Sequence, residues 1–343
     1  MLAHVIVSKY ADHQPLHRQE KIFERHGVRI SRKTMGGWLP SVAGLLDGLH
    51  QVAKKVLFAS KVIGTDDTGV KVLDPKLPFA RTGRIWPYLG DAGHPVIVMD
   101  YTPTRGRDGP AKFLNGFKGY LQADAYSVYD AFFKPARGLT EVGCMMHARR
   151  YFFKALDTDQ ERMGQALYLI ARLYKVEERA KGLTSAERLS LRKRLSAPVA
   201  AKLEKYLRQI REEVLPKSPA GAAVRYTLNQ WKALTRFLDD GDLEIDNGAT
   251  ERANRDIALG REFEIERPVA RKQREHVIEK RNARFDLRLP GAVDDQPQVD
   301  VGFAGAALDG GGALRSHESM VCPRTFISSS VPTLILAKFR VKA

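Results

Sequence analysis

The spacing of apolar and polar residues changes along the chain. Residues 15–46 carry apolar side chains at helical spacing, residues 58–145 carry short apolar runs bounded by turn residues, and residues 147–238 return to helical spacing. A period near 3.6 residues predicts amphipathic helices, and short runs bounded by Gly, Pro and Asp predict strands. The chain is therefore predicted to form helices, then a sheet, then a block of helices.

Residues 15–46 are predicted to form two or three short helices. Gly27 is placed to end one of them, and Ser31 to cap the next through its hydroxyl group. Helix, glycine turn and basic second helix form the pattern of a helix-turn-helix, which binds DNA, although a plain helical hairpin has the same pattern. The basic residues near the start of the second helix are Arg29, Arg32 and Lys33.

The middle of the chain is predicted to form a mixed α/β sheet. Two of its strands are the arms of an antiparallel excursion, and the strand within 94–103 has a continuous apolar core that indicates burial on both faces. A short helix near 110–117 precedes the strand within 119–124. The predicted strands lie within 61–66, 69–74, 83–90, 94–103, 119–124 and 139–147.

Two further segments differ from the sheet. No strand pattern interrupts residues 147–238, which are predicted to be a helical insertion, and residues 220–241 are expected to be one helix ended by Gly241. After residue 261 the chain shows no periodic element and is predicted to be irregular. The predicted domains are 1–55 (helical DNA-binding or linker segment), 56–150 (first part of the core), 151–240 (helical insertion), 241–261 (core helix) and 262–343 (divergent, poorly ordered tail).

The charge favours a polyanionic partner. The chain has 56 Lys and Arg against 40 Asp and Glu, a net charge of +16, which favours nucleic acid or an acidic membrane surface, with ordinary solubilising charge as the alternative. Nucleic acid is favoured because no stretch is apolar for long enough to span a bilayer. Only two cysteines occur, Cys144 and Cys322, without a CxxC pair, so we expect a cytoplasmic protein without a disulfide framework.

Three carboxylates are placed where they can carry chemistry. Asp66 and Asp124 each follow an apolar strand, and Glu251 lies near the start of a helical stretch. Hard divalent cations such as Mg²⁺ prefer oxygen ligands, and acids at the ends of neighbouring strands can converge on them. Each acid has a structural alternative: the aspartates as turn formers, and the glutamate as a residue stabilised by the helix dipole.

A family resemblance supports the first interpretation. The motifs "SKYADHQPLHRQ", "GTDDTGVKVLDP", "TGRIWPYLGD", "GFKGYLQADAYSVYDAFF", "CMMHARRYFF" and "LEIDNGATERANRDIALGR" resemble, in this order, those of insertion sequence 66 family transposases of the TnpC type. The resemblance covers nearly all of residues 3–261. It implies an RNase H-like core of the DDE class that cuts and joins DNA.

The resemblance also implies a site and its partners. Asp66, Asp124 and Glu251 match the catalytic acids that hold two Mg²⁺ ions, for which Mn²⁺ can substitute. Asp67 is the alternative first ligand. Neighbouring side chains in a strand point to opposite faces, so only one of the two aspartates is expected to face the site, and Asp66 is the preferred one. The implied partners are element-end and target DNA, further copies of the chain, and accessory transposition proteins of the element, in the nucleoid. Basic residues beside the glutamate, Arg252 and Arg255, are expected to contact phosphates.

Several features depart from the family or stay open. The chain is expected to be a copy truncated at the N-terminus and frame-disrupted after about residue 261, so a DNA-binding remnant that represses transposition is an alternative to an active enzyme; a structure-specific nuclease is a third. Cys144 and His147 have a Cys-x-x-His spacing, but a zinc site needs two further ligands that the sequence does not reveal nearby. Gly248 and Asn254 are expected to loosen the helix that carries Glu251.

Overall fold

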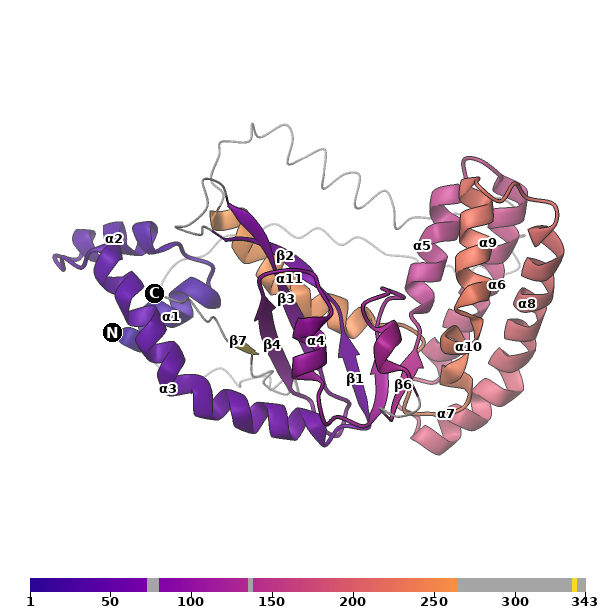
Figure 1. Ribbon diagram of the computed structural model, residues 1–343, viewed down its shortest axis with the longest axis horizontal. Helices are drawn as coiled ribbons and strands as arrows, with labels where there is room; N and C mark the ends of the chain where they lie inside the picture. Colours follow the sequence, from indigo (N-terminus) through magenta and orange to yellow (C-terminus); the bar gives the residue numbers. More distant parts are fainter. Residues whose placement is uncertain (73–79, 135–137, 265–334, 338–343) are drawn as a thin grey trace, which may run out of the picture. The chain divides into compact units, whose positions relative to one another are not determined.

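The computed structural model describes residues 1–72, 80–134, 138–264 and 335–337, and its elements follow the predicted order (Figure 1). The strands are β1 (Val62–Thr65), β2 (Thr68–Val72), β3 (Arg81–Leu89), β4 (Ile97–Thr102), β5 (Gly119–Gln122), β6 (Leu139–Val142) and β7 (Ile335–Ala337). The helices up to β6 are α1 (Leu2–Tyr10), α2 (Leu16–Arg25), α3 (Arg32–Phe58), α4 (Asp108–Phe113) and the short η1 (Asp130–Phe132). The helices after β6 are α5 (Met145–Ala155), α6 (Gln160–Arg179), α7 (Ser185–Leu191), the π-turn η3 (Arg192–Ser196), α8 (Ala197–Arg211), α9 (Pro219–Asn229), α10 (Trp231–Leu234), η4 (Arg236–Leu238) and α11 (Gly248–Glu264).

The N-terminal helices differ in length from the prediction. The expected turn is confirmed, because Gly27 has a φ of 77° and the Ser31 hydroxyl accepts a hydrogen bond from the Thr34 N–H at 3.1 Å. The prediction of two or three short helices within 15–46 is wrong: α3 has 27 residues and continues to Phe58, and α1 was not predicted. The second half of α3 buries Leu57 in the core beneath the sheet, and this packing keeps the helix intact.

The sheet has the order β6-β5-β1-β3-β4-β7, with β2 paired to β3. Strands β1, β3 and β4 are antiparallel neighbours, whereas β5 runs parallel to β1 and β6 parallel to β5. The predicted antiparallel excursion is confirmed by the pairing of β2 with β3. This mixed α/β sheet with a large helical insertion confirms the predicted fold class and is consistent with an RNase H-like core.

Helices cover both faces of the sheet. On one face Trp86 and Val98 pack in a core that includes Leu57 of α3. On the other face Ile97 and Met99 pack with Ala253 and Ile257 of α11. Neighbouring residues of β4 thus point to opposite cores, which confirms that its continuous apolar run is buried on both faces.

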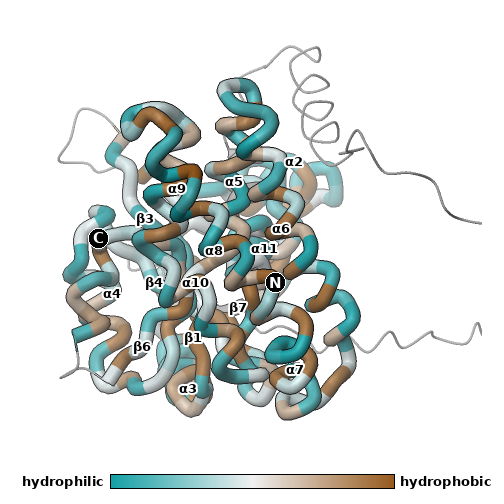
Figure 2. The backbone as a smooth tube through the Cα atoms, turned by 90° about the vertical axis from the view of Figure 1, so that its right-hand side faces the viewer, coloured by the Kyte–Doolittle hydropathy of each residue, from teal (hydrophilic) through white to brown (hydrophobic). Residues whose placement is uncertain are grey.

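The helical block after β6 has its own core. Apolar residues of α5, α6, α8 and α9 form one buried cluster, and apolar and polar positions alternate along these helices (Figure 2). Within 147–238, all of which the structure describes, no strand occurs, as predicted. The prediction of a single helix over 220–241 is wrong, because the segment divides into α9, α10 and η4.

Most of the predicted tail, 262–343, lies outside the described residues. Its described parts are residues 262–264, which end α11, and β7, which pairs in parallel with β4. Within the ranges that the structure covers, no helix combines the length and the apolar character needed to cross a membrane.

Candidate active site

Asp66 and Asp67 occupy a break in the strand at the middle of the sheet. Thr65 of β1 pairs with Tyr88 and Thr68 of β2 pairs with Ile85, so β1 and β2 keep one register against β3. This register sets the break opposite Trp86 and Pro87. Pro87 has no N–H to donate to a neighbouring strand. The break between β1 and β2 lies opposite this proline.

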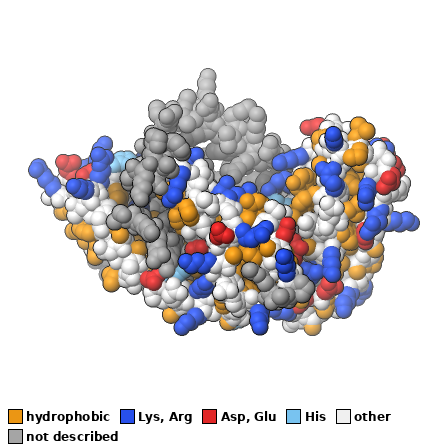
Figure 3. Space-filling model, viewed as in Figure 1, with side chains coloured by type: hydrophobic (Ala, Val, Ile, Leu, Met, Phe, Trp, Pro, Cys, Tyr) orange, Lys and Arg blue, Asp and Glu red, His pale blue; other side chains and the backbone are white. Residues whose placement is uncertain are grey.

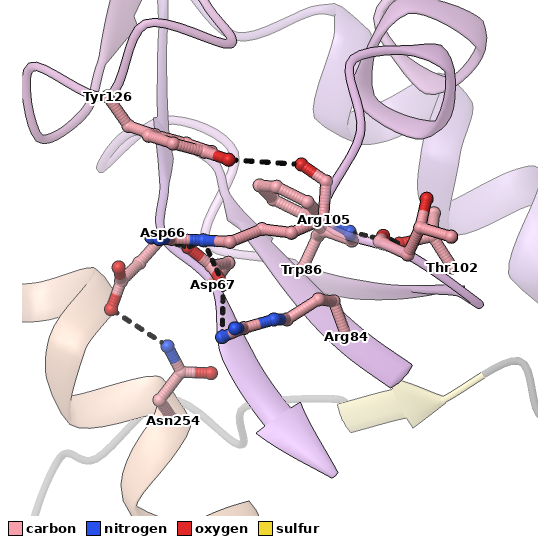
Figure 4. A network of polar contacts seen from close by, with 9 residues as sticks. Asp66, Asp67, Arg84, Trp86, Thr102, Arg105, Tyr126 and Asn254 are labelled. Carbon is pink, nitrogen blue, oxygen red and sulfur yellow. Dashed lines mark hydrogen bonds and ion pairs between the residues drawn. The ribbon is translucent and has the colours of Figure 1, made fainter. Parts of the chain in front are cut away.

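The two neighbouring aspartates have different surroundings (Figure 4). The side chain of Asp67 is only 4% exposed and forms ion pairs with Arg84 at 2.9 Å and Arg105 at 2.6 Å. Asp66 instead accepts a hydrogen bond from the side-chain amide of Asn254, on α11, at 2.9 Å. Asp67 is thus neutralised by two guanidinium groups, and Asp66 faces the helix that also carries Glu251.

Asp124 comes next to Asp66 through strand register. In the parallel pair of β1 and β5, Val62 lies beside Tyr120 and Gly64 beside Gln122. The same offset, continued past the ends of the two strands, aligns Asp66 with Asp124. Both acids therefore lie at the same edge of the sheet.

The start of α11 is fastened to the end of β1. The side-chain amide of Asn247 donates a hydrogen bond to the Thr65 carbonyl oxygen at 2.7 Å. Gly64 permits this approach, because a Cβ atom there would lie 2.3 Å from the Thr250 hydroxyl oxygen. Asn247, Thr250 and Asn254 are three and four residues apart, so they share one face of α11. Glu251, in the first turn of α11, is four residues after Asn247 and three before Asn254, and is therefore placed on this same face.

Two expectations about α11 are corrected by these contacts. Gly248 is the first residue of the helix, and its N–H donates to the Asp246 side chain at 2.8 Å, so it does not weaken a helix interior. Asn254 does not loosen the helix but anchors it to Asp66.

The carboxyl groups repel one another in a partly dehydrated setting. Burial raises the pKa of Asp66 above its usual range. Burial also raises the pKa of Asp124, and the neighbouring Asp66 and Asp67 add to this rise. The pKa of Glu251 is raised by burial and, to a lesser extent, by Asp66, whereas His147 and Arg150 oppose the rise.

The three acids offer the oxygen donors that divalent cations prefer, although their ligand atoms do not form a group within 4.8 Å of one another in the described chain. The carboxylates of Asp66, Asp124 and Glu251 are oxygen donors whose charged forms are disfavoured as they stand. Within the described chain, Glu251 Oε1 is also buried without a hydrogen-bond partner. A cation among these groups would supply the missing positive charge.

A thiol and an imidazole lie beside Glu251. His147 Nε2 is 3.7 Å from Glu251 Oε1, and Arg150 Nη2 is 3.4 Å from Glu251 Oε2. Ligand atoms of Cys144, His147 and Glu251 lie within 4.8 Å of one another. The sequence had revealed no further ligand near the Cys-x-x-His pair; the fold brings Glu251 to it.

The predicted DNA-binding residues are exposed. Arg252 and Arg255 project from α11, the helix of Glu251. Arg29, Arg32 and Lys33 surround the start of α3, and the contacts of the described residues do not link them to the carboxylates. Lys and Arg side chains are spread over the visible face rather than gathered in one patch (Figure 3).

The model of the family described as "Transposase IS66 family" matches residues 1–265. This chain belongs to the IS66 transposase family. Its similar curated proteins include three of Sinorhizobium fredii (strain NBRC 101917 / NGR234), the uncharacterized proteins y4jD, y4qI and y4hP, which are 30%, 32% and 29% identical to it. Each match covers 76% of this chain and 53%, 51% and 51% of the relative. The IS66 chain thus spans about half the length of the curated relatives that it matches.

Sequence reasoning missed several residues of the site in this IS66 chain. Arg84 and Arg105, which hold Asp67, come from β3 and from the loop after β4, and their sequence contexts give no signal. Asn247 and Asn254 had a usable signal, since they lie four residues before and three residues after Glu251 and therefore share its helix face.

Proposed function

We propose that this chain is a DNA transposase that cuts DNA at the ends of an insertion sequence and joins those ends to target DNA. Asp66, Asp124 and Glu251 are the ligands of two Mg²⁺ ions, and Mn²⁺ can substitute. The observations that support this most are the register of β1 with β5, which aligns the two aspartates, and the hydrogen bond of Asn247, which holds the start of α11, the helix of Glu251, against β1.

Each residue of the site has a distinct part in this proposal. Asn254 orients Asp66 by donating to one carboxylate oxygen. Asp67 is not a ligand, because Arg84 and Arg105 occupy its oxygens. When bound, a pair of divalent ions supplies an activated oxygen nucleophile and neutralises the charge on the displaced oxygen of the phosphodiester.

The basic residues hold the DNA. Arg252 and Arg255 are exposed on the helix of Glu251 and contact phosphates near the cut. Arg29, Arg32 and Lys33, at the start of α3, bind the element end. Further copies of the chain and accessory proteins of the same element complete the assembly on DNA.

Strand cleavage and joining test the proposal. The full chain is incubated with duplex DNA that carries the ends of the element flanking its gene, with Mg²⁺ or with a chelator. We expect metal-dependent nicking and joining that Asp124→Asn abolishes. Asp130→Asn, which removes an exposed acid of η1, is the matched control and retains activity.

Binding measurements separate the alternatives. Titration with Mn²⁺, followed by electron paramagnetic resonance, is expected to show two bound ions per chain and their loss in Asp124→Asn. Salt-sensitive binding of element-end DNA, without metal binding and without cleavage under any condition, would instead support a non-catalytic DNA-binding remnant.

A further inference from the structure

Beside the three acids lies a second group of potential metal ligands with a different chemistry. Cys144 ends the loop after β6, and His147 lies in the first turn of α5. Their ligand atoms and those of Glu251 all lie within 4.8 Å of one another. One sulfur, one ring nitrogen and one carboxylate oxygen form the kind of mixed set that Zn²⁺ binds, with a fourth position left for water or substrate.

Two polar atoms of this cluster lack hydrogen-bond partners in the part of the chain that the structure describes. Among the described residues, His147 Nδ1 and Glu251 Oε1 are buried and make no hydrogen bond. The neighbouring Asp246 does not satisfy them, because its oxygens accept from the Gly248 N–H and the Tyr174 hydroxyl group. An unsatisfied buried acceptor is costly, and a cation bound to Glu251 Oε1 removes this cost for the carboxylate.

Burial raises the pKa of the Cys144 thiol to about 11, and a hydrogen bond from Asn247 opposes this rise. The backbone N–H of Asn247 points at Cys144 Sγ from 3.3 Å. A hydrogen bond to a coordinated thiolate orients the ligand and stabilises its negative charge. The same residue anchors α11 to β1, so the sulfur and Glu251 are held by one local structure.

We propose that Cys144, His147 and Glu251 form a binding site for a thiophilic divalent cation, of which Zn²⁺ is the type, distinct from the pair of Mg²⁺ ions. On binding, a Zn–S bond replaces the S–H bond of Cys144, and the released proton goes to the solvent. No electron is transferred in this exchange.

The two metal sites share Glu251, so they compete. A Zn²⁺ ion on the cysteine withdraws the glutamate from the Mg²⁺ ligands and stops DNA cleavage. This second statement rests on the proposed function; the existence of the zinc site does not. Zn²⁺ would then inhibit DNA cleavage even when the Mg²⁺ concentration is high enough to support it.

Cobalt substitution tests the site without reference to activity. The full-length chain is titrated with Co²⁺, and the near-ultraviolet charge-transfer band of a cobalt–thiolate bond is recorded. We expect the chain to bind about one Co²⁺, which Zn²⁺ displaces. The band should be lost in Cys144→Ser, and the affinity for Co²⁺ should fall at least tenfold in His147→Asn. Cys322→Ser, which removes the only other cysteine of the chain, is the matched control and keeps the band.

The outcomes are separable. A missing charge-transfer band in the wild-type chain, or a band that Cys144→Ser keeps, overturns the zinc site; circular dichroism of each variant checks that it is folded. A band that Asp124→Asn also retains supports a site separate from the Mg²⁺ ligands, even when the wild type shows no DNA cleavage. In an active chain, Zn²⁺ inhibition should weaken at least tenfold in Cys144→Ser, and equal inhibition would refute the competition.

Discussion

At the scale of single residues, the contrast between Asp66 and Asp67 determines which acid is available to a metal. The side chains leave the same strand break, but Asp67 forms ion pairs with Arg84 and Arg105, whereas Asp66 accepts hydrogen bonds from uncharged donors, the Asn254 amide and the Asp67 backbone. The sequence left both acids as candidates. The partners supplied by β3 and by the loop after β4 distinguish them.

Reciprocal substitutions of these two acids should give opposite results. Asp67→Asn weakens two ion pairs of a buried carboxylate and should lower the free energy of unfolding by about 1–3 kcal/mol, without loss of Mn²⁺ binding. Asp66→Asn keeps an oxygen for Asn254 and should abolish Mn²⁺ binding without a comparable loss of stability. Urea unfolding and Mn²⁺ titration measure both effects, and a loss of Mn²⁺ binding in the folded Asp67 variant would contradict the assignment.

A second residue-scale prediction concerns pH. The pKa of Asp124 is raised in the folded chain, mainly by burial, so its contribution to stability is favourable below the unfolded pKa of about 4 and is lost as pH rises through the folded pKa. Without divalent metal, Asp124→Asn should therefore raise the melting temperature at pH 8, by an amount that shrinks to nothing near pH 4. Each unit of pKa difference is worth about 1.4 kcal/mol. Thermal melts in chelator across this range test it, and an unchanged or lowered melting temperature at pH 8 would contradict it.

At the scale of elements, the contact between β1 and α11 controls the geometry of the site. Gly64 is required there by the close approach of Thr250, and Asn247 and Asn254 hold the helix on either side of Glu251. A strand and a helix nearly 190 residues apart in sequence are thus joined by contacts within two turns of that helix. The position of Glu251 depends on this joint.

A double substitution tests this joint. Gly64→Ala places a Cβ atom 2.3 Å from the Thr250 hydroxyl oxygen and should lower the free energy of unfolding by about 1–3 kcal/mol. Thr250→Ala removes that oxygen and leaves the Thr250 Cβ at 3.6 Å, an ordinary contact, while the tighter contact with Asn247 Oδ1 at 3.0 Å remains. The double variant should therefore be more stable than the sum of the single losses predicts, with a coupling of about 1 kcal/mol or more in urea unfolding. Strict additivity would show that the two residues do not touch.

At the scale of the whole molecule, the chain must return from the helical block to the sheet before α11 can begin. Arg192 controls this return: it is fully buried, pairs with Glu177 at 2.6 Å, and donates to the carbonyl oxygens of Phe237, Asp240 and Leu243. Lys61, just before β1, holds Asp240 and Asp242 at 2.7 and 2.6 Å. The insertion is therefore tied to the segment that leads to Glu251.

Loss of the Arg192 contacts should have a large effect. Arg192→Met leaves Glu177 and three carbonyl oxygens without their donor, and should lower the free energy of unfolding by about 3–5 kcal/mol. Arg208→Met is the matched control, because Arg208 pairs with Glu204 on an exposed helix face and should change stability by less than about 0.5 kcal/mol. Chemical denaturation compares the two, and equal effects would contradict the structural role of Arg192.

The sequence by itself determined the succession of a helical segment, a sheet and a helical block, the cap at Ser31, the turn at Gly27 and the candidate acids at the strand ends. These features depend on spacing and on contacts within a few residues, which the chain shows directly. It failed on the length of α3, where burial of Leu57 and its neighbours against the sheet outweighs local helix-breaking residues.

Only the tertiary structure decided which residues surround the acids. The hydrogen bonds of Asn247 to Thr65 and of Asn254 to Asp66 join residues 182 and 188 positions apart, and the pairing of Asp67 with Arg105 spans 38 positions. No local pattern encodes such partners, because they meet only after the sheet register and the packing of α11 are fixed. The acids were visible in the sequence, whereas their neutralisation, orientation and proximity to Cys144 and His147 are products of the fold.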